Sequence, residues 1–267
     1  MHVITDNWFT SLTHHPHAPR RLFIFPFAGG GPASFRQWAG LFPATDILVA
    51  CLPGRENRSA EPIVTSMDEL IAALLPAIAP LLDREFYFLG YSMGGTVAFE
   101  LTQALKQHGL PQPKHFFVGA CQPPDTPPIS QRLHLLSDEQ LLRELDELGG
   151  LPQSAPEEIK QMILPALRAD LSLLARYPSP IRPPLYVPIS AFCATADALV
   201  TRKNMQRWRD KTVMHFKLHD IEGGHFFLHT QRHLLAEIMT AEMPQAYIEP
   251  ELLAPELAAP LSMRIAK

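Results

Sequence analysis

A serine flanked by glycines lies at the junction of two different residue patterns in this chain. Ser92 belongs to the segment GYSMG, where the apolar run FYFLG gives way to the helix-like pattern GGTVAFELTQAL. The spacing Gly-x-Ser-x-Gly between a strand and a helix is typical of a nucleophile elbow, a strained turn that presents the serine hydroxyl. We therefore predict that Ser92 is a catalytic nucleophile; the alternative is that it is only a helix N-cap.

A serine hydroxyl is a weak nucleophile until a base removes its proton, so a histidine and an orienting acid are also expected. Of the 12 histidines, His225 is the best placed, because it lies in the glycine-rich segment IEGGHFFL between a predicted strand and a predicted helix. The alternative is a capping or core histidine. His215 and His219 fall within the strand, and His229 falls one helical turn beyond His225.

Three aspartates are candidates for the acid that orients the histidine. Asp197 follows the apolar run PISAFC in the small-residue loop ATAD. Asp125 lies within the stiff segment PPDTPP, and Asp220 lies in the strand that leads to His225, with little room to turn back toward its ring. We predict Asp197, because the order Ser, Asp, His along the chain is that of α/β-hydrolases.

Two backbone N–H groups are expected to stabilise the oxyanion that forms when a serine attacks a carbonyl group. One belongs to Met93, the residue after the predicted nucleophile. The other is expected from Phe27 or Ala28 in FPFAGGG, whose glycines permit a tight turn. A phosphate-binding loop is the alternative, but the segment lacks the Gly-Lys-Ser/Thr sequence of a P-loop and the spacing of a dinucleotide-binding turn.

The elements that must position these residues alternate along the chain. Strand-like runs occupy residues 21–25, 47–52, 86–90, 115–121, 188–193 and 215–221, and most of them are near-continuously apolar, as is typical of parallel strands covered on both faces. Helical patterns occupy 66–82 and 94–109, and Gly109 is a stop signal for the second. The alternation predicts a mostly parallel, doubly wound α/β sheet of the α/β-hydrolase kind.

Proline marks both ends of the segment that breaks this alternation. The chain has 27 prolines, with clusters at 123–128 and 177–188. The residues between the clusters have a helical pattern. Two pairs there have capping-box spacing: Ser137 with Gln140, and Ser154 with Glu157.

This pattern defines the predicted domain organisation. We predict a helical lid insert at residues 123–184 and an α/β-hydrolase core formed by residues 1–122 and 185–243. Two ordinary crossover helices are the alternative for the insert. The Pro- and Ala-rich segment 244–267 is expected to be a loosely structured, disordered tail.

Composition argues against several classes of protein. With 267 residues, 46% of them hydrophobic, the chain is long enough to bury a large core. A formal net charge of −4 and the lack of a dense Lys/Arg tract argue against nucleic acid as a partner. No apolar run is long enough to span a bilayer, so no membrane association is expected.

The cysteines and the N-terminal histidines suggest neither a disulfide framework nor a metal site. Cys51, Cys121 and Cys193 each lie at or near the end of an apolar run, as buried free thiols do, and we expect a cytoplasmic protein. The cluster HHPH near the N-terminus is expected to be a solvated tail rather than a set of metal ligands.

Several motifs together resemble one family. The segments FPFAGGGPASFRQW, LPGRENR, GYSMGGTVAFE, DALV and GGHFFL, with Trp208, are similar to the type II thioesterases that accompany nonribosomal peptide and polyketide synthases. The resemblance covers about residues 20 to 243. Two features depart from the family: Tyr91 stands where it usually has His, and ATADA replaces a Gly- and Asp-rich loop.

The resemblance implies an activity and a site. It implies hydrolysis of stalled or aberrant acyl groups from the phosphopantetheine arm of acyl or peptidyl carrier proteins, with no cofactor or metal. The implied residues are Ser92, Asp197 and His225 as a catalytic triad and the N–H groups of Ala28 and Met93 as an oxyanion hole. A medium-chain acyl thioesterase, a small-molecule serine esterase and a non-catalytic binding module are the alternatives. We expect a monomer.

A basic segment follows the predicted acid. TRKNMQRWRDK contains Arg202, Lys203 and Arg207, which we hypothesise steer an acidic carrier protein toward the site. The alternative is an ordinary solvated helix face.

Overall fold

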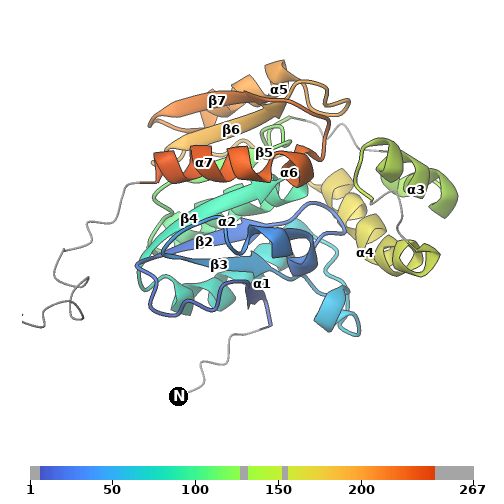
Figure 1. Ribbon diagram of the computed structural model, residues 1–267, viewed down its shortest axis with the longest axis horizontal. Helices are drawn as coiled ribbons and strands as arrows, with labels where there is room; N and C mark the ends of the chain where they lie inside the picture. The colour runs from blue at the N-terminus through green and yellow to red at the C-terminus, as the bar shows by residue number, and fades with distance from the viewer. Residues whose placement is uncertain (1–6, 127–131, 152–155, 244–267) are drawn as a thin grey trace, which may run out of the picture.

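A seven-stranded sheet runs through the computed structural model, which describes residues 7–126, 132–151 and 156–243 (Figure 1). Its strand order is β1-β3-β2-β4-β5-β6-β7, with β1 antiparallel to β3 and the other neighbours parallel. The strands are β1 (Phe9–Ser11), β2 (Arg20–Phe25), β3 (Thr45–Ala50), β4 (Glu85–Tyr91), β5 (Phe116–Gly119), β6 (Ile189–Ala194) and β7 (Phe216–Ile221). The mostly parallel α/β sheet predicted from the sequence is confirmed, and each predicted run overlaps a strand. Strand β1 was not predicted.

The helices lie between the strands and beyond them. The α-helices are α1 (Met67–Ile78), α2 (Met93–Gln107), α3 (Asp138–Glu147), α4 (Glu157–Arg176), α5 (Arg202–Gln206), α6 (Phe227–Thr230) and α7 (Arg232–Glu242). The 3-10 helices are η1 (Pro32–Trp38), η2 (Glu56–Arg58), η3 (Ala79–Leu81), η4 (Leu133–Leu135) and η5 (Arg207–Lys211).

Alternate side chains of each central strand enter two separate cores. Phe23 of β2 and Phe88 of β4 pack with α1 and α2 on one face, whereas Leu22 and Leu89 pack on the other face with η1 and α7. Successive side chains of a strand point to opposite faces, so strands buried on both sides are apolar throughout. The sheet is therefore doubly wound, as the continuous apolar runs predict.

Helix α2 ends where the sequence predicts. Gly109 has φ +66°, and its N–H bonds to the carbonyl of Lys106 while the N–H of Leu110 bonds to that of Leu105. This is a Schellman motif, in which glycine takes the left-handed conformation at low cost.

Helices α3 and α4 lie together to one side of the sheet, in the predicted insert (Figure 1). Ser137 and Gln140 form the predicted capping box of α3. The capping box predicted for α4 is wrong, because Pro156 occupies the N-cap position; Ser154 itself lies outside the described residues. Residues 244–267, predicted to be a loose tail, also lie outside them.

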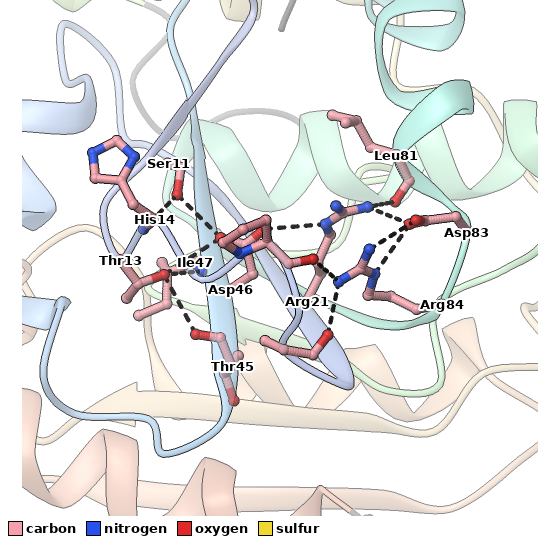
Figure 2. A network of polar contacts seen from close by, with 12 residues as sticks. Ser11, Thr13, His14, Arg21, Thr45, Asp46, Ile47, Leu81, Asp83 and Arg84 are labelled. Carbon is pink, nitrogen blue, oxygen red and sulfur yellow. Dashed lines mark hydrogen bonds and ion pairs between the residues drawn. The ribbon is translucent and has the colours of Figure 1, made fainter. Parts of the chain in front are cut away.

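A polar network joins the amino-terminal ends of the central strands (Figure 2). The Arg21 guanidinium contacts Asp46 at 3.2 Å and also contacts Asp83. Asp46 accepts a hydrogen bond from Ser11 Oγ at 3.0 Å, which fixes β1 beside β3. The network lies at the edge of the sheet opposite to the carboxyl ends of the parallel strands, where α/β proteins place their binding sites.

Candidate active site

Ser92 occupies a sharp turn between β4 and α2. Its backbone has φ +51° and ψ −121°, a conformation that is strained for any residue other than glycine. Two hydrogen bonds of 2.9 Å hold the turn: the Ser92 N–H donates to the carbonyl of Gly119, and the Gly95 N–H donates to the carbonyl of Ser92. The predicted elbow geometry is present.

The glycines of the motif are needed because other backbone segments approach them closely. A Cβ atom on Gly94 would lie 1.9 Å from the carbonyl oxygen of Phe25, and one on Gly90 would lie 2.5 Å from the Cα of Gly95. Both distances are far below van der Waals contact, so the turn can form only without these side chains.

Hydrogen bonds join Ser92, His225 and Asp197 into a chain. His225 Nε2 lies 3.1 Å from Ser92 Oγ, and His225 Nδ1 lies 2.9 Å from Asp197 Oδ2. The three residues follow β4, β7 and β6, whose carboxyl ends meet at one edge of the parallel sheet. The side chains of His225 and Asp197 are only 5% and 1% exposed, so little water competes for these bonds.

The carboxylate of Asp197 is fixed by the turn that follows it. Its Oδ1 accepts the N–H groups of Leu199 at 2.7 Å and Val200 at 3.0 Å. The other oxygen is left to accept from His225 Nδ1. Since an ionised carboxylate only accepts hydrogen bonds, Nδ1 carries the proton and Nε2 is free to accept one from Ser92.

The two rival acids have other partners. Asp125 binds Lys211 Nζ at 2.6 Å, and Asp220 binds Arg202 Nε at 2.8 Å. Of the other histidines, His219 bonds to Glu242 at 3.1 Å. His229 stacks on the ring of Phe226, and burial lowers the pKa of His229.

Two backbone N–H groups next to Ser92 have no acceptor within the described ranges. They are those of Ala28 and Met93, and both residues line the same pocket as the Ser92 side chain. The neighbouring N–H of Gly30 bonds to the carbonyl of Phe27 at 2.9 Å. The Phe27 N–H, the other donor that the sequence left open, also has no acceptor in those ranges, and Phe27 lines the pocket too, so the choice of Ala28 rests on the family resemblance.

Tyr91 supports the backbone of His225, a role that the sequence did not predict. Its hydroxyl donates to the His225 carbonyl at 2.6 Å and lies 3.4 Å from the N–H of Leu228. Burial raises the pKa of Tyr91 well above its ordinary value, so the hydroxyl keeps its proton. The only signal in the sequence is that Tyr91 departs from the histidine usual in the family that the motifs resemble.

An apolar pocket extends from Ser92 to the two helices of the insert. It encloses about 970 Å³ of empty space, counting the part open to solvent. Leucines form most of the wall on the insert side: Leu141, Leu145 and Leu148 at α3, and Leu167, Leu171 and Leu174 on α4. Glu144 and Tyr177 add polar groups. The site can therefore hold an apolar acyl group next to the serine.

The predicted docking residues lie on the segment after Asp197 but are only partly available. Arg202 pairs with Asp220, and Arg207 contacts Asp125 at 3.5 Å. Lys203 is exposed and makes no ion pair with a described residue. The charge available to a partner is therefore smaller than the sequence suggests.

The described residues contain neither a metal-ligating cluster nor a membrane-spanning helix. Within residues 7–126, 132–151 and 156–243, no group of three or more His, Cys, Asp or Glu side chains is arranged to hold a metal ion. None of the helices in the same ranges is long and apolar enough to cross a membrane.

Comparison with known proteins gives the family. The family described as "Thioesterase domain" matches residues 20–242. The gramicidin S biosynthesis protein GrsT of Aneurinibacillus migulanus is 35% identical over 241 residues, which cover 89% of this chain and 94% of GrsT. The medium-chain S-acyl fatty acid synthase thioesterase of Homo sapiens is 33% identical, covering 84% of this chain and 86% of the human protein.

A solved structure agrees with these sequences. The type II thioesterase BorB from the borrelidin biosynthetic cluster superposes with a TM-score of 0.78 at 31% identity, covering 89% of this chain and 97% of BorB. The resemblance drawn from the motifs and the α/β-hydrolase fold are both confirmed. The chain belongs to the thioesterase family and is a thioester hydrolase.

Proposed function

We propose that this thioesterase removes stalled or aberrant acyl groups from the phosphopantetheine arm of acyl or peptidyl carrier proteins, as an editing enzyme of nonribosomal peptide or polyketide synthesis. The observation that carries the proposal is the hydrogen-bonded chain from Ser92 through His225 to Asp197 at the end of an apolar pocket. The biosynthetic setting is supported by GrsT and BorB, whose names place them in gramicidin S biosynthesis and in the borrelidin biosynthetic cluster.

The first half of the reaction transfers the acyl group to the enzyme. His225 Nε2 accepts the proton of Ser92 Oγ as the oxygen attacks the thioester carbonyl, and Asp197 holds the ring in the required tautomer. The oxyanion then accepts hydrogen bonds from the N–H groups of Ala28 and Met93. The C–S bond breaks and the protonated His225 returns its proton to the sulfur, a good leaving group because a thiol has a pKa of roughly 8.5.

The second half releases the acid. A water molecule gives a proton to His225 Nε2 and attacks the acyl carbonyl, passing through a second oxyanion in the same hole. The ester bond breaks, and Ser92 Oγ recovers its proton from His225. These steps use groups of this chain alone, and the phosphopantetheine arm belongs to the substrate. We place the reaction in the cytoplasm, carried out by a monomer.

A medium-chain acyl thioesterase is the second candidate. The leucine-lined wall of the pocket favours an apolar acyl chain, and the human relative is named as a medium-chain fatty acid synthase thioesterase. A small-molecule esterase would use the same three side chains without a carrier protein. A non-catalytic binding module is disfavoured, because it would not need the serine, histidine and aspartate to remain hydrogen-bonded.

A panel of substrates with one common acyl group separates these functions. We expect kcat/KM to be highest for the acyl-carrier protein, lower for the acyl-CoA and lowest for the p-nitrophenyl ester. Equal values for the carrier protein and acyl-CoA would favour the medium-chain thioesterase. A preference for the p-nitrophenyl ester would favour an esterase, and no turnover of any substrate would contradict the proposal.

Charge steering of the carrier protein is tested at Lys203. This residue is exposed and free of ion pairs with described residues, whereas reversing Arg202 would also disturb Asp220. We expect Lys203→Glu to raise KM for the acyl-carrier protein at low salt and to leave KM for a small acyl thioester unchanged. Lys114→Glu, at an exposed position before β5, is the matched control. Equal effects of the two variants would remove the docking role.

A further inference from the structure

A buried carboxylate of the insert reaches the loop that carries Ala28. Asp170 lies on α4 and is 2% exposed. Its Oδ2 accepts the N–H of Gly29 at 2.8 Å and Arg55 Nη1 at 2.7 Å, and its Oδ1 accepts Arg55 Nη2 at 2.8 Å. The carboxylate thus makes a two-point ion pair with Arg55 while it holds the backbone next to Ala28.

The segment LPGREN holds the same loop from the other side. Arg55 Nη1 also donates to the carbonyl of Gly30 at 3.1 Å, and the Glu56 carboxylate accepts the N–H of Ala33 at 2.9 Å. Two of the motifs that marked the family in the sequence, FPFAGGG and LPGREN, are therefore joined by these hydrogen bonds.

Both peptide groups that flank the Ala28 Cα are anchored in this way. The peptide that carries the Ala28 N–H is held at its oxygen, because the Phe27 carbonyl accepts the Gly30 N–H at 2.9 Å. The next peptide is held at its nitrogen, because the Gly29 N–H donates to Asp170. Fixing the planes on both sides of Ala28 fixes the direction of its N–H.

The packing of α4 against the loop also depends on Gly29. The residue has φ +76°, and a Cβ atom at this position would lie 3.1 Å from Leu167 Cβ. Leu167 and Asp170 are three residues apart and so lie on one face of α4. The helix packs on the loop and bonds to it with that same face.

We propose that Asp170 and Arg55 are positioning residues for the oxyanion hole. Their hydrogen bonds connect α4 to the loop, so the Ala28 N–H is aligned only when α4 is packed against the loop. The proposal rests on the oxyanion role proposed above for Ala28. An alignment device affects the transition state more than the bound substrate, so its loss lowers kcat and leaves KM nearly unchanged.

A purely structural ion pair would behave differently. Replacing a buried ion pair by apolar side chains of similar size is often neutral for stability, whereas removing one partner leaves a buried charge and destabilises the protein. The double variant Arg55→Met/Asp170→Leu therefore separates stability from alignment. It restores the packing of the pair but provides no acceptor for the Gly29 N–H.

The test compares wild type, Asp170→Asn and the double variant in melting temperature, in kcat and KM for an acyl-CoA, and in affinity for an alkyl boronic acid. The boronic acid forms a tetrahedral adduct on the serine and so reports on the oxyanion hole. Asp46→Asn, which breaks the ion pair with Arg21 at the opposite edge of the sheet, is the matched control.

We expect kcat to fall about ten- to a hundredfold in both site variants, because loss of one oxyanion donor costs about 10²- to 10³-fold and a misplaced donor costs less. Boronic acid affinity should fall in parallel, KM should hold, and the double variant should melt near wild type. Asp46→Asn should lower only the melting temperature. Should one site variant fail to fold, kcat of the other decides.

Wild-type kcat and boronic acid affinity in a folded site variant, or a rise in KM alone, would overturn the positioning role. Ser92→Ala, measured alongside, tests the proposed function separately. Turnover by Ser92→Ala contradicts the triad itself, whereas an inactive Ser92→Ala with a fully active Asp170→Asn contradicts only the alignment by the insert.

Discussion

Tyr91→Phe removes one hydroxyl group from beneath the backbone of His225. The hydroxyl donates to the His225 carbonyl at 2.6 Å, and the phenyl ring that remains keeps its contacts with Phe227. Because Tyr91 is 1% exposed, no water takes the place of the lost donor without opening the structure. The substitution therefore leaves a buried carbonyl unpaired next to the catalytic base.

The size of the effect follows from that geometry. An unpaired buried acceptor costs about 1–3 kcal/mol, so the free energy of unfolding should fall by this amount. The same loss releases the backbone of His225, whose Nε2 must stay within 3.1 Å of Ser92 Oγ. Because small misplacements of a catalytic group are costly, we expect kcat to fall about tenfold.

Denaturant unfolding and steady-state kinetics measure both effects. Tyr87→Phe is the matched control, since the Tyr87 hydroxyl lies buried on the same strand with no hydrogen-bond partner in the described part of the chain. We expect Tyr87→Phe to keep or raise the free energy of unfolding and to keep kcat. If the two variants cannot be distinguished, Tyr91 does not support His225 and the reasoning fails.

Three other perturbations have sharp outcomes. Asp197→Asn should lower kcat about 10⁴-fold with the fold intact, as loss of the orienting acid does in serine protease triads. A loss below tenfold would show that Asp197 is not the acid that orients His225. Gly94→Ala should prevent folding, because its Cβ would lie 1.9 Å from a backbone oxygen, whereas Gly40→Ala, with open space around it, should fold normally; circular dichroism decides. Burial lowers the pKa of His115 from 6.5 to about 4, so the unfolded chain binds the proton more tightly than the folded one. The free energy of unfolding should therefore fall by about 3 kcal/mol as the pH drops from 6.5 to about 4, and it should depend less on pH in His115→Gln. The same pH dependence of the free energy of unfolding in wild type and His115→Gln would contradict this.

The sheet and the elbow could be predicted because their signals are local. Continuous apolar runs mark strands that are buried on both faces, and GYSMG marks a turn that few other residues can adopt. Asp197 and His225 could be placed because the carboxyl ends of parallel strands meet at one edge. Strand β1 could not be predicted, because its three residues have no distinct pattern and depend on pairing with β3.

Long-range polar contacts set the limit of sequence interpretation at the site. Asp170 lies within a helical pattern, where a charged residue is usually solvated. Its partner Arg55 is 115 residues away, and nothing in either segment indicates the pairing. The basic segment after Asp197 was overestimated for the same reason, because a local count of charges omits Asp220 and Asp125, which neutralise part of it.

The central claim is that the acyl group passes through Ser92. A rapid-quench experiment with a stoichiometric acyl-carrier protein, followed by intact mass and peptide mapping, measures this directly. The account predicts a transient mass increase equal to the acyl group, confined to the peptide that contains Ser92 and absent from Ser92→Ala. Hydrolysis without an adduct on Ser92, or an adduct on another residue such as Cys121 in the same pocket, would contradict it.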